Sequence, residues 1–71
     1  MQTQVLNAMR VKVYKVRLYD PLADETRISR RMATESGATR MGGEIIPDTG
    51  TLIMADQLEN GEQWTVRDFV P

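Results

Sequence analysis

The chain has 71 residues and a formal net charge of −1, with nine Lys or Arg, ten Asp or Glu, no cysteine and no histidine. This length predicts one small domain, and such domains often need a partner or a second copy for stability. Because the usual zinc ligands, the commonest general base and the best nucleophile are missing, we expect no metal, no cofactor and no enzyme.

Residues 1–9 are predicted to form a loose N-terminal tail ahead of a single domain over residues 10–71. This tail lacks the basic start and the long apolar stretch of a secretory signal. No apolar run in the sequence approaches the ~20 residues that a membrane-spanning helix needs. We therefore expect a cytoplasmic protein without membrane contact, which the absence of cysteine also fits.

The first predicted strand is Arg10–Tyr19, a stretch rich in valine and tyrosine. It ends at Asp20-Pro21, a pair that favours the first two positions of a turn. Thr26–Met32 is predicted to be the returning strand of a β-hairpin. We expect Asp20 to lie opposite Thr26.

This register predicts that one face of the hairpin is apolar and the other basic. The apolar face would hold Tyr14, Val16, Leu18, Ile28 and Met32. The basic face would hold Lys15, Arg17, Arg27 and Arg31 beside Tyr19, with Arg30 near by in the sequence. Val13 has the opposite phase from the apolar set, so we expect a β-bulge near Val13 that reverses the facing of the residues before it.

Thr34 is predicted to cap a short helix that has Glu35 in its first turn and ends at Gly42-Gly43. Gly37 inside this helix costs about 1 kcal/mol relative to alanine, so a glycine-rich loop is the alternative. The glycines do not indicate a nucleotide site. Glu44 follows them, where the Walker pattern needs Lys and then Ser or Thr.

Glu44–Ile46 and Thr51–Met54 are predicted to form a second β-hairpin around the turn Pro47–Gly50. Adjacent apolar residues in both strands place apolar side chains on both faces, whereas an antiparallel hairpin with one solvated face should alternate. We therefore expect one face to meet a partner, with Ile46 and Leu52 as the candidate apolar interface.

Residues 62–69 contain the only Trp and the only Phe of the chain. We expect Trp64 and Phe69 to close the core, because large aromatic side chains dominate burial in small domains. The predicted fold is α+β: a small single domain with two β-hairpins in the order β-β-α-β-β, one short helix and a C-terminal segment that closes the core.

Charge is divided unequally between the two halves of the chain. Residues 1–40 hold eight Lys or Arg and four acids, whereas residues 41–71 hold one Arg and six acids. Such a division indicates an electrostatic partner. The candidate residues for binding nucleic acid or an acidic partner are Lys15, Arg17, Tyr19, Arg27, Arg30 and Arg31. Alternatively, the basic side chains meet the acidic half of the chain, within the monomer or across a dimer, or cover a solvated face with their alkyl stems.

We predict a small, non-catalytic protein-interaction module that binds a protein partner and self-associates as a homodimer. The alternative is a nucleic-acid-binding accessory or regulatory protein that uses the basic first hairpin, because a two-stranded ribbon fits a major groove. The sequence pI near 5.2 counts against this alternative, since dedicated nucleic-acid binders are typically basic. A module of this size would suit a bacterial or phage accessory protein.

Overall fold

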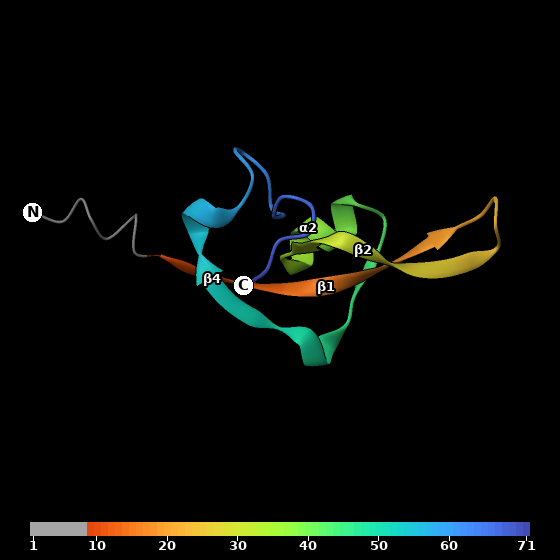
Figure 1. The fold of residues 1–71 in the computed structure, drawn as a ribbon, viewed down its shortest axis with the longest axis horizontal. Helices are drawn as coiled ribbons and strands as arrows, with labels where there is room; N and C mark the ends of the chain where they lie inside the picture. Colours follow the sequence, from red (N-terminus) through yellow and green to blue (C-terminus); the bar gives the residue numbers. More distant parts are fainter. Residues whose placement is uncertain (1–8) are drawn as a thin grey trace, which may run out of the picture.

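A long central strand, β1 (Arg10–Asp20), organises the fold, and the other strands all pair with it (Figure 1). One edge of β1 pairs with β2 (Glu25–Ala33), and the other edge pairs with β3 (Glu44–Ile45) and β4 (Thr51–Met54). All three pairings are antiparallel. The remaining elements are the helix α2 (Glu35–Arg40) and the 3-10 turns η1 (Pro47–Thr49) and η2 (Ala55–Gln57).

The structure is a computed structural model that describes residues 9–71. The predicted N-terminal tail therefore lies outside the described residues, except for Met9. The α+β class, the order β-β-α-β-β and the first hairpin are confirmed. Among residues 9–71, no helix has the length and apolar character needed to cross a membrane.

The predicted second hairpin is wrong, because β3 and β4 pair with β1 and not with each other. At η1 the chain makes one tight turn and then continues in the same direction along β1. The backbone N–H of Lys15 donates to Thr49 Oγ1 at 2.8 Å, and Lys15 O accepts from the N–H of Ile46 at 2.9 Å. The Thr49 hydroxyl thus accepts the hydrogen bond that a backbone carbonyl of a continuous strand would accept from Lys15. The chain therefore continues along β1 and does not reverse at η1.

The first hairpin forms, but its register differs by one residue from the prediction. Asp20 lies opposite Glu25 and not opposite Thr26. The Asp20 carboxylate accepts a hydrogen bond from the N–H of Leu22 at 3.0 Å, and Asp24 adopts a left-handed conformation with φ of 52°. Both features close a tighter loop than expected. The side chains at the start of β2 therefore face the opposite way from the prediction.

A bulge interrupts the hairpin in β2 and not at the predicted site in β1. Lys15 lies opposite Met32 and Arg17 lies opposite Ile28, so β1 advances by two residues where β2 advances by four. The three residues between Ile28 and Met32 carry two arginines to the edge of the sheet. β1 needs no bulge near Val13, because Val13 is buried on one face of the strand and Val16 on the other.

Val13 and Val16 mark two separate small cores on opposite faces of β1. Both residues are fully buried, and side chains three positions apart in a strand point to opposite faces. The first cluster contains Val13, Met32 and Ile53, with Val11, Leu58 and Phe69 packed against it. The second contains Val16, Ala33 and Ala38, with Leu18, Met41, Ile45 and Trp64 packed against it. Trp64 and Phe69 therefore close the core as expected, but the predicted single apolar face is wrong, and Ile28 is 49% exposed.

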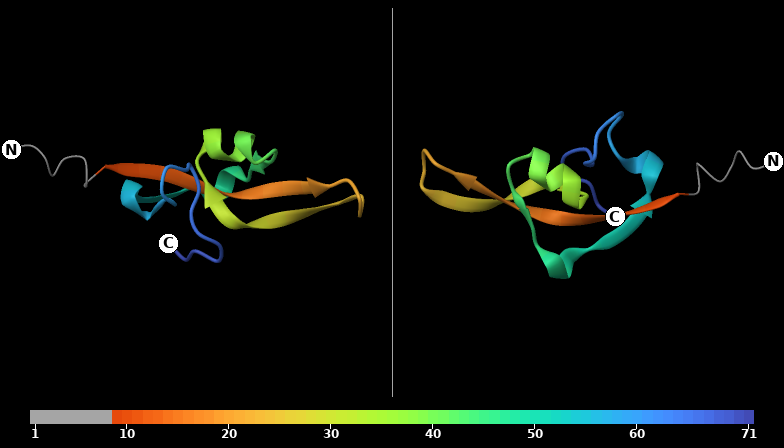
Figure 2. Two further views of the ribbon diagram at one scale, coloured as in Figure 1. Left: turned by 90° about the horizontal axis from the view of Figure 1, so that it is seen from above. Right: turned by 180° about the vertical axis from the view of Figure 1, so that it is seen from behind.

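The C-terminal segment, blue in Figure 2, lies beside the end of β2 and covers its outer edge. Thr65 anchors it, because its N–H donates to Met32 O at 2.9 Å and its Oγ1 accepts from the N–H of Met32 at 3.0 Å. Further along, the N–H of Asp68 donates to Arg30 O at 2.7 Å. Thr65 is fully buried, so its hydroxyl completes the backbone pairing of β2 inside the core.

The predicted helix and its cap are confirmed. Thr34 Oγ1 accepts a hydrogen bond from the N–H of Gly37 at 3.1 Å, and Glu35 occupies the first turn. A Cβ atom at Gly37 would lie 2.3 Å from the carbonyl oxygen of Gln63. Glycine is therefore required here for the close approach of the C-terminal segment, despite its poor helix propensity.

Candidate functional site

The first hairpin extends beyond the rest of the molecule as an arm, residues 18–27 (Figure 1). The molecule measures 52 × 23 × 19 Å, and the arm forms one end of its long axis. Every residue from 21 to 28 is exposed, and Leu22 at the tip is 98% exposed. An isolated two-stranded hairpin is only marginally stable in water, so a partner that covered the arm would stabilise it.

β2 presents an open edge where it enters the arm. Lys15 directs its backbone N–H and C=O toward η1 and Ile46, so the odd-numbered residues of β1 face away from β2. Their partners in β2, Ile28 and Thr26, consequently direct their own N–H and C=O groups outward. Within residues 9–71 no segment pairs with β2 there. We call the outer side of residues 26–28 the open edge.

A groove rich in arginine lies on one side of the open edge. It has a volume of about 330 Å³ and is lined by Leu18, Arg27, Ile28, Ser29, Arg30, Arg31, Met41 and Arg67. None of these residues is acidic. Leu18 and Met41 pack against the Val16 cluster, which places this arginine groove on the Val16 face of the sheet.

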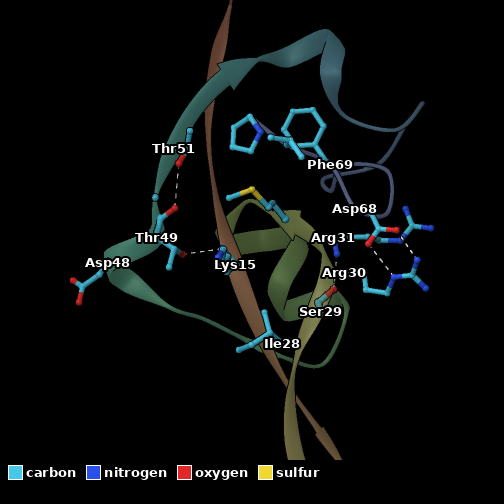
Figure 3. A pocket seen from close by; sticks show the side chains of 14 residues that line it. Lys15, Ile28, Ser29, Arg30, Arg31, Asp48, Thr49, Thr51, Asp68 and Phe69 are labelled. Atoms are coloured by element: carbon cyan, nitrogen blue, oxygen red, sulfur yellow. Dashed lines mark hydrogen bonds and ion pairs between the residues drawn. The ribbon is translucent and has the colours of Figure 1, made fainter.

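A larger groove, the Lys15 groove, lies on the opposite side of the open edge (Figure 3). It has a volume of about 730 Å³ and is lined by Lys15, Ile28, Ser29, Arg30, Arg31, Met32, Asp48, Thr49, Gly50, Thr51, Asp68, Phe69, Val70 and Pro71. Met32 and Phe69 belong with the Val13 cluster, which places this groove on the Val13 face. The two grooves share residues 28–31, so the bulge of β2 separates them.

Four arginines of the candidate set form ion pairs within the chain. The pairs are Arg17–Glu44 at 3.8 Å, Arg27–Asp20 at 4.0 Å, Arg30–Asp68 at 2.5 Å and Arg31–Glu59 at 2.6 Å. All of these pairs except Arg27–Asp20 connect the basic half of the chain, residues 1–40, with the acidic half, residues 41–71. One interpretation of the sequence expects such contacts within the monomer. The arginine side chain is exposed in the first three pairs, and exposed ion pairs contribute little to stability and are screened by salt, so acidic groups of a partner can compete for these three arginines. Arg31 is half-buried and also donates to Thr65 O at 2.9 Å.

Arg30 and Asp68 form the contact at which the C-terminal segment leaves β2. Arg30 Nε donates to Asp68 Oδ1 at 3.0 Å, and Nη2 of the same guanidinium donates to Oδ2 at 2.5 Å. This hydrogen bonding lowers the pKa of the Asp68 carboxyl and raises the pKa of Arg30. Asp68 has φ of 60°, and within residues 9–71 no backbone hydrogen bond joins a residue after Asp68 to β2.

The tip of the arm is acidic. It carries Asp20, Asp24 and Glu25 around the exposed Leu22. The hydroxyl of Tyr19 donates to Asp24 Oδ1 at 2.6 Å, and this hydrogen bond raises the pKa of the Tyr19 phenol. A nucleic-acid strand that approached the tip would meet three carboxylates.

The six candidate binding residues do not share one face of the sheet. Lys15, Arg17 and Tyr19 lie on one face of β1, Arg27 lies on the other, and Arg30 and Arg31 lie in the bulge. Arg27 changes face because the hairpin register differs by one residue from the prediction. The predicted single basic face is therefore wrong, although Arg27, Arg30 and Arg31 do meet in the arginine groove.

The two residues of the candidate apolar interface also lie on opposite faces. Ile46 lies beside Lys15, and Leu52 lies opposite Lys12. Leu52 is 59% exposed and Ile46 is half-buried. The structure therefore does not bring Ile46 and Leu52 together in one apolar surface.

Sequence reasoning missed Arg67, Met41 and the open backbone at Thr26. Arg67 is an isolated cation in the acidic half of the chain, and only the path of the C-terminal segment brings it to the other arginines. Open backbone groups leave no composition signal, because they depend on which neighbouring segment covers an edge.

Among residues 9–71 there is no group of three or more acidic side chains that could hold a metal ion. The buried side-chain polar atoms in this part of the chain all have hydrogen-bond partners. Comparison of the chain with protein-family models, with curated proteins and with solved structures finds no match. The proposals for this protein therefore rest on its own geometry.

Proposed function

We propose that this protein is a non-catalytic protein-interaction module that binds an extended segment of another polypeptide at the open edge. The observation that carries this proposal is the row of outward backbone groups at Thr26 and Ile28. It continues the row that the C-terminal segment already occupies along β2. In binding by strand addition, main-chain hydrogen bonds supply affinity and alternate side chains supply specificity.

The other outer strand is less suited to strand addition. β4 has only four residues, and the N–H of Met54 already donates to Gln57 Oε1 at 3.0 Å. Short edge strands and occupied edge groups are devices by which proteins discourage strand addition. Binding is therefore assigned to β2 and not to β4.

A symmetrical pairing of two copies is disfavoured at the open edge. If two β2 strands paired antiparallel around residues 26–28, Arg27 would lie opposite Arg27 of the second copy. Like charges directly opposite each other destabilise a strand pair. The predicted homodimer stays a separate prediction, which sedimentation velocity over a wide range of protein concentration would test.

Nucleic-acid binding is the second candidate function, and the arginine groove is the observation that favours it. Arginine contacts phosphates without regard to sequence. The acidic tip of the arm opposes this function, and so does the hydrogen bond that holds Tyr19 to Asp24. Because the tip of the arm carries three acidic side chains, it is poorly suited to enter a groove of a nucleic-acid duplex.

The proposed function can be tested with peptides selected from a displayed library of random peptides. We expect selected peptides to bind the native protein and to lose binding to the variant Thr26→Pro, which lacks the outward N–H. Proline is tolerated where an edge strand directs its N–H to solvent, so the circular dichroism spectrum should not change. Thr26→Ala keeps the N–H and should keep binding. Peptides that bind Thr26→Pro as well as the native protein would contradict the proposal, as would the recovery of none.

A further inference from the structure

We infer that the segment bound at the open edge alternates acidic and apolar side chains, an inference that rests on the proposed function. Successive side chains of a strand point to opposite faces of the sheet. A strand added at the open edge therefore directs one set of side chains toward the arginine groove and the other set toward the Lys15 groove. The two grooves differ in charge and in apolar surface, so we expect acidic side chains toward the arginine groove and apolar side chains toward the Lys15 groove.

The arginine groove suits carboxylates. Its lining includes four arginines and no acid. Arg30 and Arg31 already pair with Asp68 and Glu59, which lie outside this groove. Arg27 pairs with Asp20 only at 4.0 Å, and Arg67 forms no ion pair with any residue in 9–71. Positive charge at Arg27 and Arg67 therefore remains only partly balanced in this groove, and planar guanidinium groups bind carboxylates well.

The Lys15 groove suits apolar side chains (Figure 3). Ile28 is 49% exposed and Val70 is 83% exposed, while Phe69 and the buried Met32 supply further apolar lining. Lys15, Arg30 and Arg31 also line this groove, beside Asp48 and Asp68. Because Arg30 pairs with Asp68 and Arg31 with Glu59, a carboxylate gains less here than in the arginine groove, which has no acid in its lining. An aliphatic side chain on the added strand would cover apolar surface that is now in contact with water.

A nucleic-acid strand satisfies only one of these two grooves. Its phosphates would match the arginines, but its backbone cannot form the ladder of hydrogen bonds that Thr26 and Ile28 offer. An extended acidic polypeptide uses both grooves and the open edge together, so we assign the site to it.

Three blocked synthetic peptides test this inference by fluorescence anisotropy. Glu-Val-Glu-Val-Glu-Val-Glu alternates acidic and apolar residues. Glu-Glu-Val-Val-Val-Glu-Glu has the same composition without alternation, and Lys-Val-Lys-Val-Lys-Val-Lys reverses the charge. We expect the first to bind at least about tenfold more tightly than the other two, with binding that weakens as salt is raised.

Two protein variants separate the role of the arginine groove from that of net charge. Arg67→Glu changes a residue of the arginine groove, whereas Arg40→Glu makes the same change of charge on the exposed surface of α2, outside both grooves. We expect Arg67→Glu to weaken binding of the alternating acidic peptide about tenfold, and Arg40→Glu to change it less than about twofold. Equal losses in the two variants would overturn the inference.

The outcomes also separate this inference from the proposed function. If acidic and basic alternating peptides bind equally, and Thr26→Pro abolishes both, strand addition stands and the acidic preference is overturned. If none of the three peptides binds, but peptides from the random library bind the native protein and not Thr26→Pro, the acidic preference is overturned and strand addition stands. If single-stranded oligothymidylate binds, loses binding in Arg67→Glu and keeps it in Thr26→Pro, the arginine groove binds phosphate and the inference is overturned.

Discussion

Val13 and Val16 lie three residues apart in β1 and are both fully buried, on opposite faces of the same strand. This relationship explains why β1 does not alternate simply between apolar and polar residues. The strand crosses from one small core to another along its length. Lys15 is the one charged residue between these positions, and it is exposed.

If each valine supports its own cluster, both Val13→Ala and Val16→Ala should destabilise the protein. Removal of two buried methyl groups costs roughly 2 kcal/mol from lost burial and the cavity that remains. Denaturation by urea measures both variants. Val66→Ala is the control, because Val66 is 47% exposed and such changes stay within about 0.5 kcal/mol. A neutral Val16→Ala would contradict the second core.

Thr65 should be more sensitive to loss of its hydroxyl than its size suggests. Its Oγ1 accepts from the N–H of Met32 and donates to Val66 O at 2.9 Å. Thr65→Val keeps the volume but leaves the buried N–H of Met32 without this partner, which costs about 1–3 kcal/mol. Thr65→Ser keeps the hydroxyl and should retain more of the stability in urea denaturation. The reverse order would show that packing of the methyl group matters more.

Gly37→Ala should destabilise the protein, although alanine favours helices. In a solvated helix this change would stabilise by about 1 kcal/mol. Here the new methyl group would overlap the backbone carbonyl of Gln63 at 2.3 Å, and such overpacking costs typically about 1–3 kcal/mol. Thermal unfolding followed by circular dichroism tests this. Thr39→Ala, at an exposed position of the same helix, should be nearly neutral. An increase in melting temperature for Gly37→Ala would refute the close approach.

The ion pair of Arg30 and Asp68 predicts a pH dependence with a definite sign. Hydrogen bonding to Arg30 lowers the pKa of Asp68 in the folded protein. The stability that the carboxylate contributes is thus present above its unfolded pKa of about 3.9 and is lost as the pH falls through the folded value. A carbon-13 NMR titration should find the Asp68 carboxyl below the ordinary range, and Arg30→Gln should raise its pKa. An Asp68 that titrates normally in both proteins would contradict the contact.

Local signals in the sequence predicted β1, the return of the first hairpin, the cap at Thr34 and the closing role of Trp64 and Phe69. These features depend on alternation, on turn and cap chemistry or on aromatic size, all of which are visible in a short stretch. The pairing of β3 and β4 was not predictable in this way. Pro47–Gly50 has the composition of a hairpin turn, and only the hydrogen bond from Lys15 to Thr49 shows that the chain continues forward.

The candidate site, too, was predictable from the sequence only in part. The sequence identified Arg27, Arg30 and Arg31 as a basic set, and these residues do meet in one groove. It did not identify Arg67, which comes from a distant segment, or the open edge, which depends on how far the C-terminal segment pairs along β2. A shift of one residue in the hairpin also reverses facing, so the predicted faces were less reliable than the predicted elements.

Amide hydrogen exchange, measured by NMR, tests the open edge most directly. In the protein alone we expect slow exchange for Arg27, whose N–H faces β1, and fast exchange for Thr26 and Ile28 on the outer side of β2. Addition of the alternating acidic peptide should slow exchange at Thr26 and Ile28 and leave Arg27 unchanged. If Thr26 and Ile28 are already protected in the protein alone, or stay fast with peptide in excess, the open edge is not the binding site.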